Sequence, residues 1–200
     1  MMAAVLKLAV GLALAGLMTG SAFAQSRVTE STKYYAITGK TGMELLWDMN
    51  RKGPRHGFLT KAIAQTQFKT GYTGDFVYEN GVCRAKNASF KLQITYVYPQ
   101  PKTSLEPALA RRWKAFQATN FAHEREHGRI AKKMAASIGR KLKAFRVADK
   151  RGCDRPVAKL AKEIDAIISA QNVEQKAFDT REHRKGGPVE KSIIALVGKR

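Results

Sequence analysis

The chain is poor in three kinds of residue, and their scarcity narrows what it can do. Its 200 residues include two cysteines, four histidines and 16 acidic residues, against 36 lysines and arginines. Two cysteines are too few for a disulfide-rich scaffold or a cysteine-based zinc module, and neither has a Cys or His neighbour at ligand spacing. A metal site in this sequence therefore depends on its histidines.

The sequence also has no apolar run long enough to cross a bilayer. The run from Leu8 to Met18 spans about 11 residues, whereas a membrane helix needs roughly 20. It follows Lys7 and precedes Ser21-Ala22-Phe23-Ala24, which is the layout of a secretory signal with an A-x-A cleavage site. We therefore expect residues 1–24 to be a signal peptide, residues 25–200 to form a single domain, and the protein to be secreted or periplasmic.

Export would place the two cysteines in an oxidising compartment. We expect Cys83 and Cys153 to form one disulfide bond, the alternative being two buried free thiols. The formal net charge of +20 would attract anionic envelope polymers, lipid head groups or acidic proteins. No helix-turn-helix, zinc-finger or ribonucleoprotein motif is present, so we do not expect nucleic acid as a partner.

The N-terminal half has the pattern of a sheet. Apolar residues alternate with others from Phe90 to Tyr98, which predicts a half-buried strand. Asn80-Gly81 and the segment from Gly71 to Gly74 are typical of hairpin turns, so we expect an antiparallel sheet. One helix should come after Gly42, and its predicted apolar side consists of Met43, Leu46, Trp47 and Met49.

Two helices are predicted in the second half. Apolar residues at steps of three and four predict a long helix over residues 107–147, with a break allowed near Asn120 or Gly139. A second, antiparallel helix should follow Asp154 and end before Phe178, and residues 192–197 should form a strand or a docked tail. The predicted fold class is α+β, with the sheet packed on the long helix in a zincin-like arrangement.

The long helix carries the pattern H-E-x-x-H at His123-Glu124-Arg125-Glu126-His127. On a helix, His123 and His127 stack on one face and can bind one zinc ion, while Glu124 can act as general base on a zinc-activated water. The expected function is zinc-dependent hydrolysis of peptide bonds, with Zn²⁺ as cofactor and a peptide or protein as substrate. The alternatives are a non-catalytic, zinc-stabilised cationic envelope protein and a metal-free cationic protein.

A catalytic zinc ion normally has three protein ligands, so a third is needed. Lys133 stands where metzincins have a histidine, which excludes that subclass. Of the two remaining histidines we choose His183, which follows the second helix, over His56, which lies in the sheet half. The alternatives for the third ligand are Glu163, Asp179 and Glu182.

The layout resembles a bacterial family of predicted secreted zinc-dependent proteases, one of the domains of unknown function. The resemblance covers most of residues 25–200. It is carried by Tyr35-Ala36-Ile37, Gly39, Thr41, Gly53-Pro54, Cys83, the strand to Tyr98, Trp113, Phe116, the H-E-x-x-H motif, Cys153, Phe178-Asp179 and His183. It implies His123 and His127 as ligands, Glu124 as the catalytic residue and a late histidine as third ligand. Phe178 and Arg184 depart from the Tyr and Gly that the family usually has there.

Overall fold

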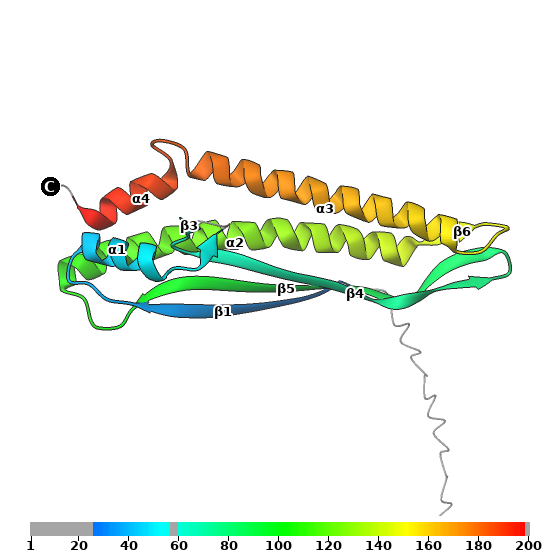
Figure 1. Cartoon of the computed structure of the whole chain (residues 1–200), viewed down its shortest axis with the longest axis horizontal. Helices are drawn as coiled ribbons and strands as arrows, with labels where there is room; N and C mark the ends of the chain where they lie inside the picture. Colours follow the sequence, from blue (N-terminus) through cyan, green and yellow to red (C-terminus); the bar gives the residue numbers. More distant parts are fainter. Residues whose placement is uncertain (1–25, 57–59, 199–200) are drawn as a thin grey trace, which may run out of the picture.

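The computed structural model describes residues 26–56 and 60–198, with only the backbone of His56 and Thr60. The predicted signal peptide lies outside these residues. The described part is α+β, with a main sheet, a small hairpin and four helices (Figure 1). In chain order these are β1 (Arg27–Ile37), α1 (Gly42–Lys52), β2 (Arg55–His56), β3 (Thr60–Lys61), β4 (Gln65–Glu79), β5 (Val82–Pro101), α2 (Pro107–Ala144), β6 (Arg146–Ala148), α3 (Asp154–Glu182) and α4 (Pro188–Val197).

The main sheet is mixed, which corrects the prediction of an antiparallel sheet. Its order is β1-β5-β4, with β6 paired to β5. β5 is antiparallel to β4 and β6 but parallel to β1. Parallel strands need a long crossover, and here α1, the β2–β3 hairpin and β4 all lie between β1 and β5 in the chain.

Of the two predicted hairpin turns, one is confirmed. Asn80 and Gly81 connect β4 to β5, both with positive φ. The turn predicted from Gly71 to Gly74 is wrong, because β4 runs through this segment with an irregularity between Thr73 and Asp75. Gly74 has φ 113°, and a Cβ there would lie 2.4 Å from Ala88 Cα, so this glycine marks a bulge and not a chain reversal.

The core lies between β5 and α2. The five alternating residues of β5, from Phe90 to Tyr98, are all buried, as predicted. They pack against α2 residues that include Met134 and Ile138. α2 is one helix of 38 residues, about 57 Å long, without the break that we allowed. It ends at Ala144 instead of Val147, because the chain then forms β6 beside β5.

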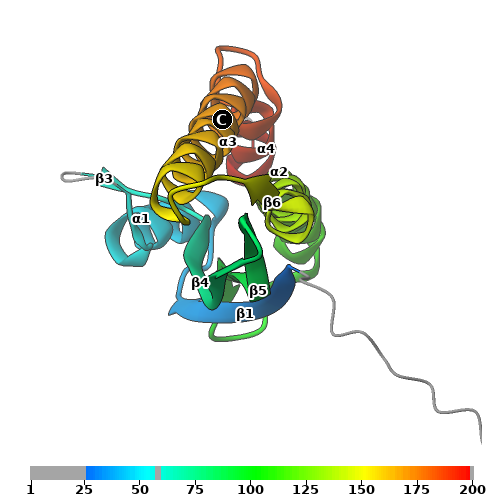
Figure 2. The same ribbon diagram turned by 90° about the vertical axis from the view of Figure 1, so that its right-hand side faces the viewer.

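α3 runs antiparallel to α2 over the same face of the sheet (Figures 1 and 2), and its Leu160 joins the core formed by β5 and α2. It continues to Glu182, so the predicted end before Phe178 is wrong. Phe178 is buried and anchors the last turns of α3, which contains no glycine. The start of α3 is tied to β5 by the Cys83–Cys153 disulfide.

The last described helix lies beside α1. The segment predicted as a strand or tail is the helix α4, which packs through the buried Leu196 against Ile37 and Leu45. Met49, predicted to face inward from α1, is buried, but Trp47, also predicted to face inward, is 65% exposed, because α1 buries Leu45 in its place. Within residues 26–56 and 60–198, no helix is long and apolar enough to span a membrane.

Candidate metal centre

A cleft of about 800 Å³ lies beside the middle of α2. Its walls come from α2, the C-terminal half of α3, α4 and the first residues of β4. His123, Glu124 and His127 line it from α2, while Asp179 and His183 line it from the end of α3. Because α3 extends to Glu182, residues more than 50 positions apart in the sequence line the same cleft.

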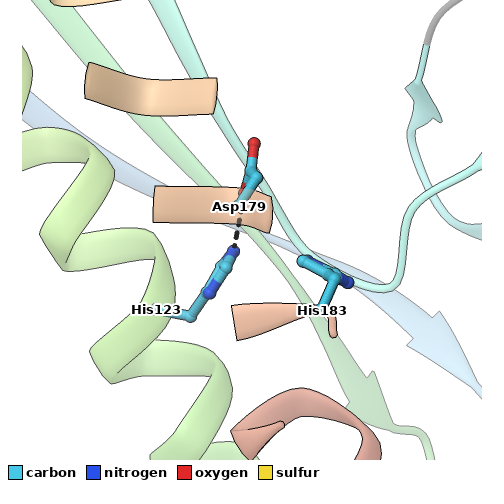
Figure 3. Close-up of side chains that lie close together, drawn as sticks. All are labelled: His123, Asp179 and His183. Carbon is cyan, nitrogen blue, oxygen red and sulfur yellow. Dashed lines mark ion pairs between the residues drawn. The ribbon is translucent and has the colours of Figure 1, made fainter. Parts of the chain in front are cut away.

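Three candidate ligand atoms form a small triangle in this cleft. The Nε2 atoms of His123 and His127 are 3.2 Å apart. Asp179 Oδ1 lies 3.4 Å from the first and 3.0 Å from the second. His183 lies next to His123, and ligand atoms of His123, Asp179 and His183 all fall within 4.8 Å of one another (Figure 3).

These distances fit a zinc ion. A tetrahedral site with Zn–N and Zn–O bonds of about 2.0–2.1 Å has neighbouring ligand atoms about 3.3–3.4 Å apart. The triangle of two imidazole nitrogens and one carboxylate oxygen has sides of 3.2, 3.4 and 3.0 Å. The nitrogen and oxygen donors are also of the type that zinc prefers. These residues can therefore hold zinc with little rearrangement.

The surroundings of His123 and His127 leave each imidazole with a nitrogen lone pair that can bind a metal. Burial, together with the neighbouring His127 and His183, lowers the pKa of His123 to about 4, so its imidazole is neutral at pH 7. Gln175 fixes the ring of His127, because its Nε2 donates to the His127 carbonyl at 3.0 Å and its Oε1 accepts from His127 Nδ1. The Nδ1 atom of His127 then carries the proton, so its Nε2 atom has a lone pair that can bind a metal.

Glu124 lies in the same cleft but contributes no atom to the ligand triangle. Its side chain is buried, and the Thr66 hydroxyl donates to Oε2 over 2.6 Å. Burial raises the pKa of Glu124, an effect that the hydrogen bond from Thr66 partly opposes. A carboxyl group with a raised pKa is better suited to accept a proton near neutral pH than an exposed glutamate.

α2 and β5 are in close contact at Gly128, the residue that follows the H-E-x-x-H motif. A Cβ on Gly128 would lie 2.1 Å from the hydroxyl oxygen of Tyr96 on β5, so only glycine fits there. The Tyr96 hydroxyl in turn donates to Glu30 on β1, over 2.7 Å. This contact fixes the rotation of α2 at the residue that follows His127.

The other sequence candidates lie elsewhere. Glu163 pairs with Lys141 at 2.5 Å, and it is 16 residues, or about 24 Å, from Asp179 along α3. Glu126 pairs with Arg129 on the solvent side. The backbone of His56 lies in β2.

Two residues of the site were missed from the sequence, Gln175 and Thr66. Gln175, Asp179 and His183 repeat at steps of four, so a helix extended through residue 183 would have placed all three on one face. Nothing in the sequence marks Thr66, which reaches Glu124 from β4 across 58 positions.

Comparison with known proteins gives one match. The family model described as "Bacterial protein of unknown function (DUF922)" matches residues 32–187. No curated protein and no solved structure matches the chain. The matched range includes both ends of the candidate metal centre, from the motif on α2 to His183.

Proposed function

The chain belongs to the DUF922 family of bacterial proteins of unknown function, and we propose that it is a zinc-dependent peptidase that acts outside the cytoplasm. The observation that carries this proposal is the triangle of His123 Nε2, His127 Nε2 and Asp179 Oδ1, with sides of 3.0–3.4 Å, next to the buried Glu124. Two histidines and one carboxylate form the ligand set of a catalytic zinc site, and a separate buried glutamate can serve as its general base.

Each residue has a separate role in this proposal. His123, His127 and Asp179 hold the zinc ion, with His183 beside them at the mouth of the site. When bound, zinc lowers the pKa of a coordinated water and polarises a carbonyl group. Glu124 accepts a proton from the attacking water and passes it to the leaving amine. Thr66 holds the Glu124 carboxylate in place for both transfers.

A peptide substrate is supported by the strand next to the site. Within the described residues, β4 is paired only with β5, so its other edge is free. Its residues Gln65, Thr66 and Phe68 line the cleft beside Glu124. An extended peptide can add to such an edge through main-chain hydrogen bonds, which would carry its amide groups past the ligand triangle.

Location outside the cytoplasm and a zincin-like fold complete the proposal. The Cys83–Cys153 disulfide is consistent with an oxidising compartment. The motif helix packed on a sheet whose edge runs along the cleft supports the zincin-like interpretation.

Metal content and hydrolysis test the proposal together. The purified protein should contain one zinc ion per chain by elemental analysis and should cleave an unfolded protein substrate such as reduced casein. Removal of the metal with a chelator should abolish cleavage, and one equivalent of zinc should restore it. A protein that takes up no zinc, or that cleaves equally well without it, would overturn the proposal.

Gln175 offers a separate test through zinc affinity. Gln175→Ala removes both hydrogen bonds that orient His127, so we expect zinc to bind about 10–100-fold more weakly. The measurement is competition with a chromophoric chelator. Asn172→Ala is the matched control, because it removes another amide that lines the same cleft on α3, and it should leave the affinity unchanged. Equal affinities for the two variants would show that Gln175 does not position a ligand.

A second candidate function is suggested by the outer face of the sheet. The side chains of β5 that alternate with its buried ones point away from α2. Register places Arg27 of β1 beside Lys91, and Lys69 of β4 beside Gln93. Together with Lys33 these exposed cations form a cationic face. Glu30 of β1 points to the opposite face, where it accepts hydrogen bonds from Tyr96 and Lys132. Such a face suits an anionic envelope polymer, with zinc only stabilising the fold. Only hydrolysis requires Glu124, which separates the two candidates.

A further inference from the structure

A second groove lies far from the metal centre. It has a volume of about 540 Å³ and is bounded by the end of α2, by β6 and by the first half of α3. Its first α2 residue, Ser137, is 10 residues beyond His127, or about 15 Å along the helix. None of its lining residues belongs to the cleft around His123. The groove is therefore a separate feature of the surface.

The floor of this groove is apolar. It includes Phe145, Val147, Leu160 and Ile167, of which Leu160 is buried and Val147 is 40% exposed. Phe145 is fixed from below by an edge contact with Phe76, the ring centroids being 5.3 Å apart. A floor of this kind can cover an alkyl chain.

The rim of the groove is cationic. Arg140, Lys141, Arg146 and Lys159 line it, against one acid, Glu163. Glu163 is already paired with Lys141. Among the residues that the structure describes, Arg140, Arg146 and Lys159 have no ion-pair partner. Lys159 is attracted at longer range to Glu163, and Arg146 to Glu79. With four cations and one acid in its lining, the groove still has an excess of positive charge.

We propose that this groove binds a single-chain amphiphile of the fatty-acid type, with its alkyl chain on the apolar floor and its carboxylate at the cationic rim. The volume lies in the range of small-molecule sites, about 300–1,000 Å³. An uncharged amphiphile would cover the floor but leave the rim unpaired. A small anion would meet the rim but leave the floor exposed. Only a ligand with both parts matches both features.

Titration calorimetry with dodecanoate, below its micelle-forming concentration, tests the proposal. One equivalent should bind, and dodecyl maltoside, which has the same chain and no charge, should bind at least about tenfold more weakly. Arg140→Glu should weaken dodecanoate binding at least about tenfold, whereas Arg111→Glu makes the same charge change elsewhere on α2 and should have little effect.

A second pair of variants tests the floor. Val147→Glu puts a carboxylate in the groove, and Val173→Glu makes the same change at a 70% exposed position of α3 outside it. Only the first should weaken dodecanoate binding. Unaltered circular dichroism of each variant excludes misfolding as the cause. Absence of saturable binding, equal affinity for dodecyl maltoside, or equal effects within either pair of variants would overturn the proposal.

Discussion

Glu124→Gln should lower kcat/KM for peptide hydrolysis by about 10²–10⁴-fold and leave one zinc ion bound per chain. The amide keeps the size of the side chain and can still meet the Thr66 hydroxyl, so the site should keep its shape. It has no basic oxygen of comparable strength, so it can neither take the proton of the attacking water nor deliver one to the amine. Steady-state kinetics on a quenched fluorescent peptide, together with elemental analysis, measure both quantities.

Glu126→Gln is the matched control for this prediction. It makes the same chemical change two residues away, on the solvent side of α2, where Glu126 pairs with Arg129. A surface pair of this kind contributes little to stability, so activity and zinc content should both stay close to those of the unaltered protein. Full activity of Glu124→Gln would remove the proposed general base. A similar loss in both variants would indicate a general effect of charge near the cleft.

The elements with a regular burial pattern were the ones that the sequence predicted well. β5 alternates because one of its faces packs on α2, and α2 repeats at three and four because one stripe packs on β5. Both patterns therefore reflect the contact between β5 and α2. His123 and His127 belong to that repeat, which is why their helical position and shared face could be predicted before their surroundings were known.

The elements that were predicted wrongly depend on contacts between distant parts of the sequence, which no local pattern indicates. The parallel pairing of β1 with β5 joins residues about 64 positions apart, such as Ser31 and Thr95. The last turns of α3 look polar, yet Phe178 holds them by packing against the rings of His123 and His127, at centroid distances of 4.9 and 5.1 Å. The site itself fixes the end of α3, so the sequence of α3 alone could not predict where it ends.

This error bears on the choice of the third ligand. We chose His183 from the sequence over His56 because it was expected to lie after the end of the second helix. In the observed helix, Asp179 and His183 are one turn apart and both face the cleft. Asp179 Oδ1 is within 3.4 Å of both imidazole nitrogens, whereas His183 is the residue after the last turn of α3. The sequence-based assignment of His183 stays a prediction, with Asp179 as the ligand that the distances favour.

Asp179→Ala should therefore weaken zinc binding by more than about 100-fold, while His183→Ala should weaken it by about tenfold at most. The first removes an atom of the ligand triangle, and the second removes a neighbour of His123 at an exposed position. Chelator competition measures each affinity. His123→Ala gives the value for loss of a ligand that both assignments share. Thr180→Ala, which alters the same cleft without removing a donor from the triangle, should bind zinc as the unaltered protein does.

The pattern of losses also decides between the two candidate functions. If only Asp179→Ala loses zinc affinity, the zinc ion of the unaltered protein has three protein ligands and one open position, as a hydrolytic site requires. The reverse order, with the larger loss in His183→Ala, would give the third position to the histidine and keep the site open. Large and equal losses in both variants would mean four protein ligands and a closed, structural zinc site. Glu124 would then have no water to act on, and the cationic outer face of the sheet would become the better guide to function.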